Sequence, residues 1–255
     1  MTEGVKSAER VLGIFEVFEA ERRPLRISEL VKSLKIPQSS TSTLMKTLVA
    51  NGLFEFDPEH RTFQPSVRLA FLGNWVLGSH DVLAQIQALL QKLASETGET
   101  AIVGAQNGAN VQYLSVIVSE HLLPLALRPG IVRPLHMSGL GLMLLSKKND
   151  DEIRRLVLRY NFEATLDCAE ANVSAVLARI SEVRANGYCE TAGLVSPGAG
   201  VIATLLPLPV EGRYLAIGLG ASVGRLDARR QFLRETLMAE IGQFAHTCDA
   251  AQKVA

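Results

Sequence analysis

The sequence contains little that would form a metal site, a disulfide framework or a membrane span. Its three cysteines, Cys168, Cys189 and Cys248, form no CxxC pair and show no zinc-site spacing with histidine. Scattered cysteines in an odd number are typical of free thiols in a reducing cytoplasm. No apolar run approaches the roughly 20 residues that cross a bilayer. Glu16 interrupts the N-terminal stretch VLGIFEVF, so we expect no signal peptide there.

Cofactor motifs are also missing. The glycine-rich stretch GLGASVG at 218–224 is one residue too long for the dinucleotide-binding spacing, and no βαβ pattern surrounds it. The five histidines lie far apart and form no HExxH pattern. We therefore expect a cytoplasmic protein with no membrane segment, no metal and no cofactor.

The chain has no overall excess of charge of either sign. Its 26 Lys and Arg residues balance 26 Asp and Glu residues. With 47% apolar and 20% charged residues, a chain of 255 residues suits one large or two ordinary globular domains. The balance breaks locally, because residues 22–48 contain six basic residues and one acidic residue, a net charge of +5. Such a basic stretch is where phosphates would be met.

The first 65 residues show the order helix, helix, tight turn, helix, hairpin. Apolar spacing predicts a helix over 7–20, with an apolar face formed by Ala8, Val11, Leu12, Phe15 and Phe18. A second helix, with Ser28 as its N-cap, stops before Pro37. A third spans 38–50, and the stretches LFEF and RTFQP around the turn DPEH predict a short hairpin. This order is the outline of a winged helix-turn-helix.

The predicted third helix has an apolar face and a hydroxyl-rich face. Thr41, Leu44, Met45 and Leu48 share the first, and Ser39, Ser42, Thr43 and Lys46 share the second. Together with the basic stretch, this favours DNA binding over a three-helix domain whose charges only face solvent. The predicted DNA-contacting residues are Arg26, Ser28, Gln38, Ser39, Ser40, Ser42, Thr43, Lys46, His60 and Arg61.

The rest of the chain mixes helices and strands. Residues 66–79 predict a linking helix, and a further helix ends at Gly98. Asn107-Gly108 predicts a tight hairpin turn. Two more helices are expected near 150–160 and 170–186, strands over 201–210 and 214–222, and a final helix over 226–248. This pattern indicates an α+β domain on a mostly antiparallel sheet.

Three stretches resemble the IclR family of bacterial transcription regulators. They are KIPQSSTSTLMKTLVANGLFE, GIVRPLHMSGLGLM at 130–143 and GYCETAGLVSPGAGVIA at 187–203. The resemblance implies a winged helix-turn-helix DNA-binding domain over 1–65, a linker helix over 66–79, and a GAF-like effector-binding and oligomerisation domain over 80–255. It also implies a homodimer, often a dimer of dimers, that binds operator DNA as a repressor or activator under the control of a small metabolite.

The resemblance further implies which residues contact the effector: His136, Met137, Ser138, Gly139, Leu140, Gly141, Cys189, Thr191, Val201, Gly218 and Gly220. Several depart from relatives that bind small carboxylates. Val201 replaces a Cys or Ser, Gly218 and Gly220 replace two serines, and Leu142 replaces a basic residue. The backbone amides of Ser138 to Gly141 remain as anion donors.

From these departures we expect a larger, more apolar effector, such as an aromatic acid. It would occupy volume that the two glycines open. The alternative is a pocket filled by the protein's own side chains.

One departure bears on DNA recognition. Many family members carry arginine at the position of Thr43, so base readout here would depend on Gln38, Lys46 and DNA shape. A hydrolase that pairs Cys189 with His136, and a dimeric scaffold without DNA function, are the alternatives to a regulator. We expect a regulator, most simply a repressor, and no enzyme.

Overall fold

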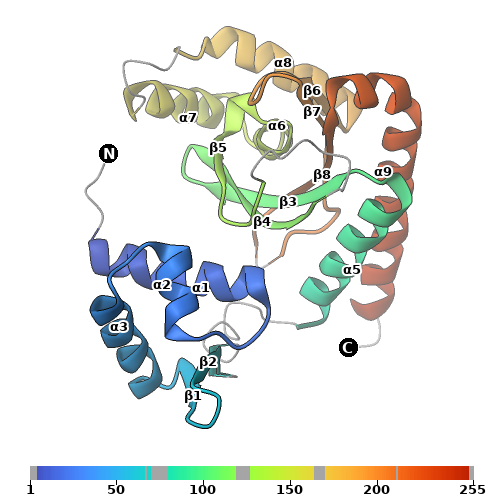
Figure 1. Cartoon of the computed structure of the whole chain (residues 1–255). Coiled ribbons are helices and arrows are strands. Elements are labelled where there is room, and N and C mark those ends of the chain that lie inside the picture. The colour runs from blue at the N-terminus through green and yellow to red at the C-terminus, as the bar shows by residue number, and fades with distance from the viewer. Residues whose placement is uncertain are drawn as a thin grey trace. The chain divides into compact units, whose positions relative to one another are not determined.

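The computed structural model describes residues 5–66, 68–69, 80–118, 127–163, 170–210 and 212–252 (Figure 1). The chain divides into two compact units, Met1–Gly78 and Ser79–Ala255, and each is described by itself. The linker helix expected over 66–79 lies almost entirely outside the described residues, and the predicted domain boundaries stay predictions. None of the helices in the described ranges has the length and hydrophobicity needed to cross a membrane.

The first unit is a winged helix-turn-helix, as the sequence predicted. Its elements are α1 (Lys6–Glu21), α2 (Ile27–Leu34), α3 (Gln38–Ala50), β1 (Phe54–Asp57) and β2 (Thr62–Pro65). The two strands pair antiparallel, with Phe56 opposite Phe63. One apolar core joins the three helices to the hairpin, and it contains Ile14, Phe18, Leu25, Leu30, Met45, Leu48, Phe54 and Phe63.

Two local predictions in this unit were wrong. Leu12 does not belong to the buried face of α1, since its side chain is 62% exposed while Ile14 is fully buried. Residues two apart lie about 200° apart around a helix, so Leu12 and Ile14 cannot share a face. Ala8, which was placed on the same face, is exposed as well. Ser28 is not the N-cap of α2, because the helix begins at Ile27. Arg26 is the N-cap instead, and its backbone N–H donates to Glu29 Oε2 at 2.8 Å, as in a capping box.

The second unit contains a six-stranded antiparallel sheet in the order β5-β4-β3-β8-β7-β6. Its strands are β3 (Thr100–Asn107), β4 (Asn110–Ile117), β5 (Val132–Pro134), β6 (Cys189–Ala192), β7 (Ala199–Leu205) and β8 (Leu215–Ser222). Its helices are α5 (His80–Thr97), α6 (Gly139–Leu145), α7 (Asp150–Glu163), α8 (Val173–Asn186) and α9 (Val223–Gln252), with a 3₁₀ turn, η1, at Leu135–Met137.

Helices cover both faces of this sheet (Figure 1). Helices α5 and α9 pack against one face over Ala101 and Val103, and α6, α7 and α8 cover the other over Ile102 and Ala203. The alternation along β3 follows from the pleat, which points successive side chains to opposite faces. The α+β fold with a mostly antiparallel sheet is therefore confirmed, including the hairpin at Asn107-Gly108, where Gly108 has φ +60°.

A buried carboxylate holds α9 against the start of β3. Glu99 is fully buried, and its Oε1 accepts hydrogen bonds from Arg225 Nη2 at 2.7 Å and Arg229 Nη1 at 3.0 Å. Arg229 Nη1 also donates to the carbonyl of Thr97 at 2.7 Å. These charge-assisted bonds fix the register of α9 on the sheet.

Close contact between α6 and its surroundings depends on glycine. A Cβ on Gly141 would lie 2.5 Å from the Cα of Leu135 and 2.7 Å from its carbonyl carbon. A Cβ on Gly218 would lie 2.8 Å from the Ile202 carbonyl oxygen and 3.1 Å from a methyl of Leu140. The helix can therefore lie directly on η1 and on the sheet only while these positions carry no side chain.

We expect Gly141→Ala to lower the free energy of unfolding by about 1–3 kcal/mol, because backbone atoms of Leu135 cannot move away cheaply. The matched control is Gly242→Ala in α9, where a Cβ would meet open space. That change should raise stability by up to about 1 kcal/mol, through helix propensity alone. Urea unfolding of both variants measures the difference, and equal stabilities would contradict the close contact.

Candidate functional site

An open groove of about 750 Å³ lies in the first unit between α2, α3 and the hairpin. Most of the predicted DNA-contacting residues line it: Arg26, Ser28, Gln38, Ser42, Lys46, His60 and Arg61. The others, Ser39, Ser40 and Thr43, lie on α3 outside this lining. Gln38, Ser42 and Lys46 are four residues apart in sequence, so one face of α3 presents all three to the groove.

The threonine hydroxyls of α3 are bonded to the helix itself. Thr43 Oγ1 donates to the Ser39 carbonyl at 3.0 Å, and Thr47 Oγ1 donates to the Thr43 carbonyl at 3.0 Å. Thr41 is fully buried on the core side, as predicted, and donates to the Pro37 carbonyl at 3.2 Å. Because their protons are used by the backbone, the exposed threonines offer methyl groups and lone pairs to a partner.

Charge is distributed unevenly around the groove. Arg23 forms ion pairs with Glu21 and Glu29 at 2.9 and 2.8 Å. At the hairpin tip, His60 Nδ1 lies 2.7 Å from Asp57 Oδ2, and this bond, with backbone bonds from the same turn, lowers the pKa of Asp57. Among the described residues, Lys46 and Arg61 form no ion pair. Arg26, which also lines the groove, forms no ion pair among the described residues either, so these three carry positive charge that is available to phosphates.

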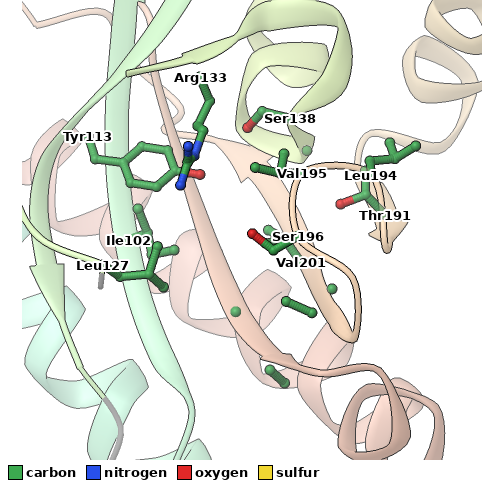
Figure 2. Close-up of a pocket in the computed structure, with 15 residues that line it drawn as sticks. Ile102, Tyr113, Leu127, Arg133, Ser138, Thr191, Leu194, Val195, Ser196 and Val201 are labelled. Atoms are coloured by element: carbon green, nitrogen blue, oxygen red, sulfur yellow. The ribbon is translucent and has the colours of Figure 1, made fainter. Parts of the chain in front are cut away.

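A smaller cavity of about 50 Å³ lies in the second unit (Figure 2). The sheet, the start of α6 and the loop between β6 and β7 surround it. Five of the predicted effector residues line it: Ser138, Gly139, Thr191, Val201 and Gly220. The remaining six, His136, Met137, Leu140, Gly141, Cys189 and Gly218, are outside its lining.

The residues outside the lining have other neighbours. Leu140 and Cys189 are buried in the core between the sheet and helices α6, α7 and α8. His136 packs its ring against Tyr160, with centroids 4.4 Å apart. Gly218 does not open the volume expected from the sequence, because Leu140 fills that space. Gly220 does leave room for a methyl group, since the nearest atom would lie 3.5 Å from an added Cβ.

The cavity has polar groups that the sequence interpretation missed. Tyr113 on β4 is 4% exposed, and its hydroxyl forms a hydrogen bond with the hydroxyl of Ser138. Burial raises the pKa of Tyr113, against the smaller effects of Ser138 and of the nearby charge of Arg133. The buried Nε of Arg133 has no hydrogen-bond partner among the described residues. The available signal was a charged residue inside the apolar motif GIVRPLH.

Family comparisons agree with this architecture. The IclR helix-turn-helix domain matches residues 7–58, and the C-terminal domain of bacterial IclR transcriptional regulators matches residues 74–248. The HTH-type transcriptional regulator XynR of Escherichia coli K12 is 25% identical over 184 residues, 72% of this chain and 73% of that protein. The HTH-type transcriptional regulator KdgR of the same strain is 25% identical over 250 residues, which are 97% of this chain and 92% of that protein.

Solved structures show the same fold. The effector domain of the transcriptional regulator IclR from Acinetobacter sp. ADP1 has a TM-score of 0.62 at 32% identity, covering 65% of this chain and 96% of that one. Thermotoga maritima IclR has a TM-score of 0.62 at 15% identity, and the match covers 94% of this chain and 97% of that one. The chain belongs to the IclR family of bacterial transcriptional regulators, and it is a DNA-binding regulator of transcription.

Proposed function

We propose that this regulator binds operator DNA through α3 and the hairpin, and that a small carboxylate in the cavity of the second unit changes that binding. The observation that carries the first part is the groove, where Gln38, Ser42 and Lys46 share one helix face beside Arg26. In this proposal residues 1–65 form the DNA-binding domain, 66–79 the linker helix, and 80–255 the effector-binding and oligomerisation domain.

Each groove residue suits a different contact with the duplex. The amide of Gln38 can pair with an adenine edge in the major groove, and Lys46 can neutralise a phosphate. Ser42 is short, so the helix can approach closely. Arg61 lies in the turn between β1 and β2, directly before β2, and has a left-handed backbone with φ +53°. The ring of His60 is held by Asp57, 2.7 Å from Nδ1, so it is less free to contact a phosphate.

The ligand part of the proposal follows from the cavity's lining. Apolar side chains of Ile102, Leu127 and Val201 form one part of it, and Arg133 supplies a positive charge. A volume of about 50 Å³ is far below that of drug-sized sites. It therefore favours a small acid over the aromatic acid expected from the sequence. We further propose that the protein acts in the cytoplasm as a homodimer or a dimer of dimers, and as a repressor.

The hydrolase alternative has less support from the geometry. Burial raises the pKa of Cys189 to about 11, so its thiol is protonated near neutral pH. Its Sγ lies 4.0 Å from the Glu190 carbonyl oxygen, and His136 packs against Tyr160. Burial also lowers the pKa of His136. We propose that this domain binds its ligand without transforming it.

Cys189 should resist alkylation in the folded protein. At pH 8 about 0.1% of a thiol with this pKa is ionised, and the side chain is 3% exposed. Iodoacetamide should therefore modify Cys189 at least ten-fold more slowly in buffer than in 8 M urea, measured by peptide mass spectrometry. Equal rates in the two conditions would show a reactive thiol and would favour catalysis.

Lys46→Ala should weaken binding to the DNA that flanks the protein's own gene. Loss of one phosphate contact per protomer should reduce the slope of log affinity against log salt by about one for each protomer bound. The matched control is Lys6→Ala, an exposed lysine of the same unit outside the groove lining. Gel shifts at three salt concentrations measure both. A wild-type slope in Lys46→Ala would place the DNA elsewhere, and no specific shift by the wild type would contradict the proposal.

Thr43→Arg should change the preferred operator sequence. An arginine on the exposed face of α3 can reach guanine, the commonest specific contact in the major groove. Binding-site selection from random duplexes should then enrich guanine at one position per half-site. An unchanged selected sequence would mean that Thr43 does not face the bases.

A further inference from the structure

We propose that Arg133 and Tyr113 hold the carboxylate of a short-chain monocarboxylic acid at one end of the cavity. This inference rests on the proposed function, since it names the ligand class of the same site. It assigns recognition of the acid to β4 and β5. The predicted contacts on β7 and β8, Val201 and Gly220, offer carbon and open space instead.

The buried Nε of Arg133 is the first observation. Arg133 is the one charged side chain among the described lining residues, and its Nε is buried without a hydrogen-bond partner among them. A buried donor without a partner is costly, and an acceptor supplied by a ligand can remove that cost. The planar guanidinium matches a carboxylate in a two-bond geometry that a lysine cannot reproduce.

Tyr113 supplies a second donor next to Arg133. Figure 2 shows the Arg133 guanidinium and the Tyr113 hydroxyl at the same end of the cavity. Tyr113 is protonated at neutral pH, because burial raises its pKa. A serine hydroxyl can donate the bond that joins Ser138 to Tyr113, so the tyrosine proton is available to an anion.

Both donors stand on strands rather than on loops. Arg133 lies opposite Val111 in the β4–β5 ladder. The backbone N–H of Tyr113 donates to the carbonyl of Ile131 at 2.8 Å, and the Tyr113 carbonyl accepts from Gly130 at 2.7 Å. This pairing keeps the two side chains in a fixed relation before any ligand binds, which reduces the entropy cost of binding.

The remaining lining limits the rest of the ligand. Ile102, Leu127 and Val201 surround it with carbon, and Gly220 leaves space for about one methyl group. One water molecule needs about 10–15 Å³ of cavity volume. A volume of about 50 Å³ therefore admits roughly three to five groups of that size. A carboxylate with a chain of about two or three carbons fits this space.

The test uses the full chain with sodium butyrate as the probe and butyramide as its uncharged counterpart. Butyrate should raise the melting temperature of the wild type, and butyramide should not. Calorimetric titration should show at least ten-fold weaker butyrate binding in Arg133→Met and a three- to ten-fold loss in Tyr113→Phe. The matched control is Arg154→Met on α7, an exposed arginine outside the lining, which should bind butyrate like the wild type.

Three outcomes would overturn the inference: butyrate fails to bind the wild type, butyramide binds equally well, or Arg133→Met retains wild-type affinity. Tyr113→Phe keeps the test decisive if Arg133→Met does not fold, since it preserves the aromatic ring. Gel shifts with and without butyrate distinguish failure of the ligand assignment from failure of the proposed regulatory function. If butyrate binds through Arg133 but leaves wild-type DNA affinity unchanged, the ligand assignment stands and its regulatory role fails.

Discussion

The close packing of α6 against the sheet is the constraint on which the second unit depends. Three glycines permit it: Gly141 beside the backbone of Leu135, and Gly104 and Gly218 beside the side chain of Leu140. Because Leu140 occupies that space, no ligand can, and the free volume is confined to the region near Gly220. The same packing brings Ser138 within hydrogen-bonding reach of Tyr113. A helix held this close determines both the size of the cavity and one of its polar walls.

The first unit uses charge locally rather than globally. The whole chain is neutral, yet Lys46 and Arg61 line a groove in which the described residues provide neither with an ion-pair partner. Nearby Arg23 is neutralised by two glutamates. A DNA-binding surface therefore depends on which basic residues are left without acidic neighbours, and a count of charges along the sequence does not reveal this. Thr43 and Thr47 of α3 offer DNA no additional hydrogen-bond donors, since their hydroxyl protons are bonded to the helix backbone. Their small size lets the duplex approach the helix closely.

Loss of polar side chains at one wall of a cavity does not make the whole cavity apolar. The sequence showed carbon at Val201 and glycine at positions 218 and 220, and this suggested a larger and more apolar ligand. The structure places a guanidinium and a phenol across from that wall, on β5 and β4. A charged group in a confined, largely apolar space selects ligands by charge first and by size second. The buried Glu99, by contrast, finds its partners within the fold, where its Oε1 pairs with Arg225 and Arg229 and anchors α9.

The sequence by itself determined the elements whose signals lie within a few residues of one another: the three helices and hairpin of the first unit, the turn at Asn107-Gly108, and the final helix. Its errors there were local, such as Leu12 and the N-cap at Ser28. Only the tertiary structure decided that β5 and β6 exist, since strands of three or four residues are defined by their partners. Only it brought Arg133 beside Tyr113 and filled the space at Gly218. Periodicity and turn chemistry act along the chain, whereas a cavity is formed by side chains from distant strands.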